Sequence, residues 1–234
     1  MPLTGTIINF LAILAGGGLG LLFKKGLPAR YMQALLFAIS LIVFALGLSY
    51  VLKSADIMVV LLSVIMGTLA GTALKLGTRL QSLGDNLQGR MKLGDGRFSD
   101  GFVSCTLLYC VGAMAITGSI QDGLNGDPTI LFLKSVMDGV TAIFFASTMG
   151  VGVLFSAVPV LLYQGAIALM ASLLSGVLDM AVVTEMAAAG GAALMALSLN
   201  MMEVKKFNVA DMLPAIFFPI AVLPLMRWIT SLFS

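Results

Sequence analysis

Histidine is absent from the 234 residues of this chain, and only 10% of the residues are charged. Without histidine, the chain has no histidine proton relay and none of the usual zinc and haem sites, so any proton coupling would have to use carboxylates. A soluble globular chain carries about 25% charged residues. Here 59% of the residues are hydrophobic and the mean hydropathy is +1.07. We therefore predict an all-α fold, a polytopic bundle of transmembrane helices.

Cysteine and catalytic motifs are also scarce. Cys105 and Cys110 lie five positions apart in one apolar stretch. A helix turns them away from each other, which predicts two small buried side chains and no disulfide. The sequence has no HExxH, no P-loop and no GxSxG with a histidine partner. We expect no enzyme activity, no metal and no cofactor, and the net charge of +2 gives no sign of nucleic-acid binding.

Hydrophobic runs divide the chain into about eight predicted spans, in a single integral membrane domain over residues 1–234. We place the spans at about residues 4–23, 31–52, 57–76, 99–119, 128–148, 153–175, 181–202 and 210–232. Pro214, Pro219 and Pro224 fall in the last span, so we predict that it is kinked or discontinuous. Positive charge follows the first run and does not precede it, which is typical of an uncleaved first helix with its N-terminus outside.

The only long polar stretch is residues 77–98, which we predict to be cytoplasmic. Leu80, Leu83 and Leu87 recur there at helical spacing, so a helix on the membrane surface and a solvated connector both fit. With the N-terminus outside, three of the 13 Lys and Arg residues fall outside, which leaves ten on the cytoplasmic side. This bias follows the positive-inside rule and predicts that both termini lie outside, in a protein of the bacterial inner membrane.

The most informative polar residues lie in the fifth span. Asp127 is a good N-cap and Pro128 suits the first helical position, so a helix should begin there. Lys134 and Asp138 then lie four residues apart on one face of this helix. Asp138 is roughly 15 Å along the helix, near the middle of a hydrocarbon core about 30 Å thick. An ionisable side chain at that depth is a candidate for a functional site.

Two interpretations of this pair remain open. In the first, Asp138 binds a coupling cation, a proton or a substrate, and Lys134 lies nearer the outer mouth of the site. In the second, Lys134 and Asp138 are a structural ion pair inside the bundle. The spacing of the two residues is compatible with both.

An acidic, glycine-rich turn at about residues 120–127 holds three further candidates, Asp122, Asn125 and Asp127. As a re-entrant or gating segment, the turn would offer oxygen atoms to a cation. As an ordinary capped turn, it would only begin the next helix.

Uncharged polar residues give the remaining candidates. Ser147 and Thr148 add hydroxyl groups to the end of the fifth span, and Gln164 lies in the sixth. Gln164 would either line a cavity or join two helices by a hydrogen bond. Asn9 in the first span has the same two interpretations, and we favour the hydrogen bond between helices.

Glycines at spacings that allow close helix contact occur in several spans. Gly16 and Gly20 form one GxxxG motif, Gly67 and Gly71 form another, and Gly190–Gly191 adds a third small surface. These surfaces exceed what eight helices need among themselves, which predicts a homo-oligomer, most simply a homodimer.

The order of these features resembles the YdfK/YqgA-type family of bacterial multi-pass membrane proteins, a family with a domain of unknown function. The resemblance lies in the start GTIINFLAILAGGGLGLLFKK, in residues 118–165, in the loop LGDNLQGRM and in the ending PAIFFPIAVLPL. It implies an integral membrane protein with a transport role. It brings no substrate and no catalytic residue with it.

Two classes of function fit these observations. The first is a secondary transporter of a small solute or ion across the bacterial inner membrane, with Asp138 at its site and with spans broken by glycine and proline. The alternative is an accessory or structural membrane subunit, or a passive channel, whose polar residues only pack helices. The expected partners are bilayer lipid and one small solute or ion.

Overall fold

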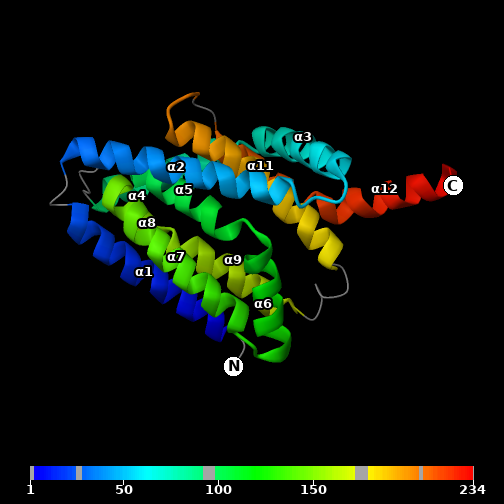
Figure 1. The fold of residues 1–234 in the computed structure, drawn as a ribbon, viewed down its shortest axis with the longest axis horizontal. Coiled ribbons are helices and arrows are strands. Elements are labelled where there is room, and N and C mark those ends of the chain that lie inside the picture. The colour runs from blue at the N-terminus through cyan, green and yellow to red at the C-terminus, as the bar shows by residue number, and fades with distance from the viewer. Residues whose placement is uncertain (1–2, 25–27, 92–97, 172–178, 206–207, 234) are drawn as a thin grey trace.

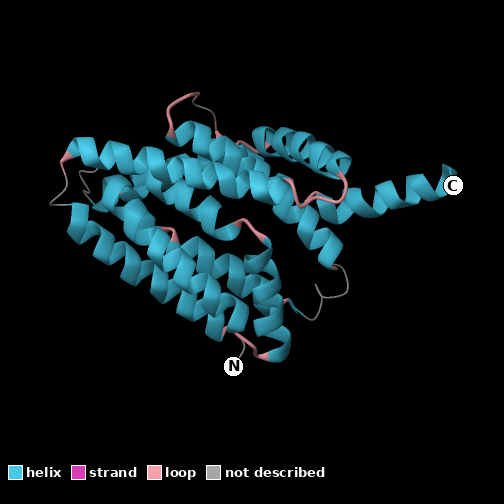
Figure 2. Cartoon of the chain, viewed as in Figure 1, coloured by secondary structure: helices cyan, strands magenta, loops and turns pink. Residues whose placement is uncertain are grey.

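The computed structural model describes residues 3–24, 28–91, 98–171, 179–205 and 208–233. Within these ranges the chain is helical, with short turns and no strand (Figure 2). The helices are α1 (Thr4–Lys24), α2 (Ala29–Val51), α3 (Ile57–Ala73), α4 (Leu76–Met91), α5 (Phe98–Cys110), α6 (Ala113–Asn125), α7 (Thr129–Met149), α8 (Gly152–Phe155), α9 (Ala157–Leu169), α11 (Met180–Met201), the 3₁₀ helix η1 (Val209–Ile216) and α12 (Pro219–Phe233). The predicted all-α fold is confirmed.

By length and composition, the described residues supply between five and eight membrane spans. Five are uninterrupted or nearly so, namely α1, α2, α7, the α8–α9 segment and α11. Three bent pairs raise the number to eight: α3 with the start of α4, α5 with α6, and η1 with α12. The bends measure 55°, 63° and 53° respectively. The eight spans predicted from the sequence correspond to counting each bent pair once.

Two helix pairs form the frame of the bundle (Figure 1). α1 and α7 lie side by side and run in the same direction, because Gly5 meets Leu131 at one end and Gly20 meets Ile143 further along. α2 and α11 run in opposite directions, and the Ser198 hydroxyl of α11 donates a hydrogen bond to a carbonyl of α2. We call the end of the bundle at which α1 and α7 begin the N-terminal end. α12 leaves the bundle and carries the C-terminus away from it (Figure 1).

Glycines allow the helices to approach one another within the chain. A Cβ atom added at Gly16 would lie 2.0 Å from the carbonyl oxygen of Gly139 on α7, and one at Gly71 would lie 1.9 Å from that of Asp211 on η1. The other glycines of the motifs also meet neighbouring elements of the same chain. The small surfaces from which a homodimer was predicted are therefore occupied within one chain. They no longer argue for a second copy, and the dimer stays a prediction.

The contact of Gly16 with α7 can be tested with two substitutions in α1. Gly16→Ala should destabilise the protein by roughly 1–3 kcal/mol, because the added methyl group forces α1 away from α7. Gly18→Ala should cause no loss, because a Cβ at Gly18 meets nothing within 4 Å. Reversible unfolding of both variants in detergent mixtures measures the difference. Equal stabilities for the two variants would contradict the close contact between α1 and α7.

The span predicted at about residues 99–119 differs from the structure. It consists of two helices, α5 and α6, that meet at a break beside Gly112. Gly112 has φ of 118°, which other residues rarely adopt, so glycine permits the break. α6 then continues until Gly126, which has φ of 65° and ends the helix in the usual left-handed conformation. The turn predicted at about residues 120–127 is therefore helical over most of its length.

Two other predictions about irregular segments have clear outcomes. The last span is discontinuous as predicted, because η1 contains Pro214 and is bent relative to α12, which begins at Pro219. The polar stretch at residues 77–98 is a helix, α4, as far as Met91. Its remaining residues, 92–97, lie outside the described ranges.

Carboxylates from distant parts of the sequence hold the beginnings of two helices. Asp211 Oδ1 accepts the backbone N–H of Gly77 at the start of α4, at 2.7 Å. The buried carboxylate of Glu185 accepts the N–H of Ala55 at 2.8 Å and the hydroxyl of Ser54 at 2.6 Å, in the turn before α3. The first N–H groups of a helix have no partner in the helix and attract negative charge. Such capping ties together spans that are far apart in the sequence.

The predicted orientation in the membrane can be tested at the two ends of the bundle. In a background without the native cysteines, Lys53→Cys lies in the exposed turn between α2 and α3, and Ser82→Cys lies on the exposed side of α4. In intact cells an impermeant thiol reagent should label Lys53→Cys, whereas Ser82→Cys should react only after permeabilisation. If Ser82→Cys is labelled in intact cells and Lys53→Cys is not, the true orientation is the reverse of the predicted one.

Candidate functional site

Lys134 and Asp138 lie on the inner face of α7, where they are only 6% and 7% exposed. Lys134 Nζ lies 2.5 Å from Asp138 Oδ2. The neighbouring side chains Leu133 and Met137 point the other way and are 56% and 55% exposed. α7 therefore presents its apolar side outward and its charges to the bundle, as ionisable residues in membrane helices usually are.

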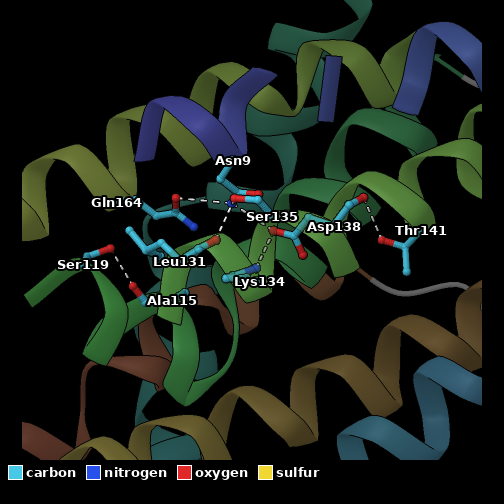
Figure 3. A network of polar contacts seen from close by, with 9 residues as sticks. All are labelled: Asn9, Ala115, Ser119, Leu131, Lys134, Ser135, Asp138, Thr141 and Gln164. Carbon is cyan, nitrogen blue, oxygen red and sulfur yellow. Dashed lines mark hydrogen bonds and ion pairs between the residues drawn. The ribbon is translucent and has the colours of Figure 1, made fainter. Parts of the chain in front are cut away.

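Two amides from other helices complete a buried polar network with this pair (Figure 3). Asn9 Nδ2 on α1 donates to Asp138 Oδ2 at 3.0 Å and to Gln164 Oε1 on α9 at 3.3 Å. Neither amide side chain is exposed. The carboxylate fixes the orientation of Asn9, because the flipped amide would place an oxygen against Oδ2.

The ammonium group of Lys134 has a second partner. It lies 5.9 Å from the centre of the Tyr109 ring, within the range of a cation–π interaction. Tyr109 is in the last turn of α5, so the ammonium is near the C-terminal end of that helix, where carbonyl groups carry partial negative charge. Both members of the ion pair are therefore supported by groups from other helices.

Two atoms of the amides have no hydrogen-bond partner among the described residues. They are Asn9 Oδ1, which can accept a hydrogen bond, and Gln164 Nε2, which can donate one. Buried polar atoms in native proteins nearly always bind another group or water. An acceptor, a donor and two opposite charges thus lie together in the interior, and this set can bind a small polar molecule or ion.

The three candidates of the acidic turn make no hydrogen bond or ion pair with Lys134 or Asp138 among the described residues. Asp122 lies in α6, is fully buried, and accepts the N–H of Gly5 at 2.9 Å. Asn125 is exposed at the end of α6. Asp127 accepts the hydroxyl and the N–H of Thr129, which lowers the pKa of Asp127 below its usual range. The helix begins one residue later than the sequence predicted, with Pro128 as the N-cap residue, and Asp127 binds the first helical residue from the position before it.

Ser147 and Thr148 lie about 14 Å beyond Asp138 along α7. Their hydroxyl groups donate to carbonyl oxygens of their own helix, at 2.8 Å from Ser147 to Phe144 and at 3.0 Å from Thr148 to Phe145. Neither side chain takes part in the network around Asp138. The structure therefore joins Asp138, Lys134 and Gln164 in one hydrogen-bonded network through Asn9, and none of the other candidates forms a hydrogen bond within it.

A cavity of about 470 Å³ opens at the end of the bundle opposite to the N-terminal end. Its polar lining includes Gln81, Ser99, Asp100, Ser104, Glu203 and Asn208, and its described lining contains no Lys or Arg. None of the candidate residues lines it. α5 nevertheless connects the two regions, because Ser104 lines the cavity and Tyr109, about 7.5 Å further along the helix, lies over Lys134.

Sequence reasoning missed Tyr109 and undervalued Asn9. Asn9 carries a detectable signal, because it is a polar side chain in the interior of an apolar span of 20 residues. Tyr109 has no such signal in the sequence, because its contact with Lys134 depends on where α5 ends. The two cysteines are free and buried, as predicted.

The pair can be tested as a structural element. Asp138→Asn should lower the free energy of unfolding by roughly 3–5 kcal/mol, because it leaves the Lys134 charge buried without its partner. The double variant Asp138→Asn with Lys134→Met should recover most of this loss. Unfolding of purified protein in detergent measures both effects. A single variant as stable as the wild type would show that the ion pair contributes little to stability.

Comparison with known proteins gives a family and two relatives. Residues 4–223 match the family described as Protein of unknown function (DUF554). The chain is 29% identical to the "Uncharacterized membrane protein YdfK" of Bacillus subtilis (strain 168) over 219 residues, which are 92% of this chain and 93% of the relative. It is 30% identical to the "Uncharacterized protein YqgA" of Escherichia coli (strain K12) over 217 residues, 91% and 92% of the two chains. No solved structure matches.

Proposed function

This chain belongs to the DUF554 family, whose function is unknown. From the geometry of the site, we propose that the protein is a secondary transporter. The transported species is a small polar solute or ion, and the membrane is the bacterial inner membrane. Asp138 and Lys134 bind the solute or the coupling ion, and the amides of Asn9 and Gln164 orient it.

The observation that carries this proposal is the unsatisfied polar network in the interior. The neighbours of a purely structural pair are expected to make their hydrogen bonds within the protein, because lipid tails cannot supply a missing one. Here Asn9 Oδ1 and Gln164 Nε2 have no partner among the described residues, and they lie beside the charges of Asp138 and Lys134. A bound solute would supply the missing donor and acceptor.

The position of the cavity supports alternating access to that network. Along α5, Leu107 lies between the cavity wall and Tyr109, and along α7, Phe145 lies between the cavity wall and Asp138. Both side chains are buried in the apolar core. The core layer around Leu107 and Phe145 acts as a barrier between the cavity and the site, and a transporter must open and close such a barrier.

The broken helices support movement at that barrier. α5 carries cavity residues and Tyr109, and it ends two residues before the bend at Gly112. A change of the bend would shift the cavity wall and the aromatic ring over Lys134 together. Hinges of this kind absorb backbone rotation at a few positions next to element ends.

A screen followed by a transport assay tests the proposal. Thermal shift of the purified protein is measured against salts, amino acids and organic acids. A true ligand should raise the Tm of the wild type but not that of the stable double variant Asp138→Asn with Lys134→Met. Uptake of that ligand into proteoliposomes or cells should then collapse with an uncoupler and be lost in the double variant.

The control is Ser147→Ala, whose hydroxyl bonds only to its own helix and lies away from the network. It should bind and transport as the wild type does. Normal transport in the double variant would exclude the pair as the site. Transport that is unaffected by the uncoupler would favour a passive channel. If no ligand binds and no flux is measured, a structural or accessory subunit is favoured.

A further inference from the structure

Buried polar atoms without a partner gather in one part of the molecule. In the described residues they are Thr6 Oγ1, Asn9 Oδ1, Ser63 Oγ, Tyr109 Oη, Asp122 Oδ1, Tyr163 Oη and Gln164 Nε2. All except the one on Ser63 belong to α1, α5 and α6, which pack against α7, or to α9, which packs against those three helices. When no protein group reaches a buried polar atom, a water molecule usually does. The clustering therefore points to one hydrated region.

Two of these residues, Thr6 and Asn9, lie on α1, and two more bind α1 by hydrogen bonds, Asp122 at Gly5 and Gln164 at Asn9. We call these four residues the α1 polar row. At one end of the row, Asp122 accepts the N–H of Gly5. At the other, Asn9 donates to Asp138. Gly5 and Asn9 are four residues apart, about 6 Å along the helix axis. The carboxylates of Asp122 and Asp138 are therefore linked through roughly one turn of α1.

Asp122 has the chemistry of a proton acceptor at the beginning of this row. Its side chain is fully buried, one oxygen accepts the Gly5 N–H, and the other oxygen has no donor. Among the described residues it makes no ion pair. The oxygen without a donor can accept a hydrogen bond from water.

Asp138, at the other end, is surrounded by few titratable groups. These are Lys134 on α7, Tyr109, Cys105 and Cys110 on α5, and Tyr50 on α2. α1 and α9 contribute the neutral amides of Asn9 and Gln164. Lys134 is the only cation in this set, so a proton on Asp138 leaves one unbalanced positive charge at the site.

We propose that the α1 polar row holds water and carries protons between the N-terminal end and Asp138. This inference rests on the proposed transport function and makes the proton its coupling ion. A proton from water binds Asp122 Oδ1 and then passes along the row to Asp138, which leaves Asp122 as a carboxylate again and Asp138 neutral. A neutral Asp138 holds Lys134 less strongly, so the arrival of the proton frees the ammonium group for the solute.

Infrared difference spectroscopy of the protein in lipid tests this route without any substrate. A protonated carboxyl group has a C=O band that shifts when its hydrogen is exchanged for deuterium. As the pH is lowered, one band should appear that is lost in Asp122→Asn and another that is lost in the stable double variant Asp138→Asn with Lys134→Met. After transfer to D₂O, the Asp138 band should shift quickly in the wild type and slowly in Asp122→Asn.

Asp122→Asn keeps an oxygen that accepts the Gly5 N–H, so its fold should be preserved. The matched control is Asp127→Asn, a neighbouring carboxylate outside the row, which should exchange like the wild type because asparagine also caps helices. If Asp122→Asn does not fold, Thr6→Val removes a hydroxyl of the row at nearly constant volume and should slow the exchange in the same way.

Two results would overturn the inference. One is the lack of any Asp138 band over the whole pH range in which the protein stays folded. The other is unchanged exchange of that band in the folded Asp122→Asn or Thr6→Val variant. If either result is found together with uncoupler-sensitive uptake of a solute, the proposed transport function stands and the proton route along the α1 polar row is rejected. If deuterium exchange of the Asp138 band is rapid but no solute is taken up, the proton route stands and the proposed transport function is rejected.

Discussion

Lipid tails offer no hydrogen-bonding groups, and this is the constraint on which the rest of the structure depends. A charge in the membrane interior must find its partners within the protein. Lys134 and Asp138 meet this requirement together, since each neutralises the other and each is also held by a group from another helix, Tyr109 or Asn9. Because these groups come from α1, α5 and α7, satisfying one charged pair fixes how three spans sit relative to one another.

The same constraint explains how the helix ends are held. Asp122, Glu185 and Asp211 each accept N–H groups at or just before the start of another helix. Each bond spans more than 100 residues of sequence and joins two spans at an end of the bundle. Along the helix axes, close contacts at glycines hold neighbouring helices together, as between α1 and α7. Polar contacts between spans and small residues in their faces are what hold membrane bundles together, because lipid gives helices no hydrophobic reason to associate.

The sequence predicted the parts of the fold that depend on local patterns. Apolar runs predicted α1, α7 and α11 to within about two residues, because composition alone decides whether a segment can enter a bilayer. The spacing of Lys134 and Asp138 predicted their contact, since four residues make one turn. The prolines predicted the break before α12.

The remaining features depend on contacts between distant segments. Asn9 lies 129 residues from Asp138 in the sequence, and nothing near either residue indicates that α1 and α7 are neighbours. The break at Gly112 was missed because a glycine in an apolar run fits a continuous helix equally well, and only φ distinguishes the two. The glycine motifs were interpreted as a surface for a second copy because a sequence does not show which helix a small face meets.

A pair that stabilises the fold and a pair that binds a solute are compatible in this arrangement. Lys134 and Asp138 are tolerated in the interior because together they are neutral, and any species that binds one of them disturbs that neutrality. A proton on Asp138 or an anion on Lys134 changes the net charge of the site and weakens the link between α1, α5 and α7. A ligand can shift a conformational equilibrium only by its difference in affinity for the two states. In the proposed transporter, a ligand that binds this pair would bind differently once the links to α1 and α5 change, which would couple occupancy of the site to the arrangement of the helices.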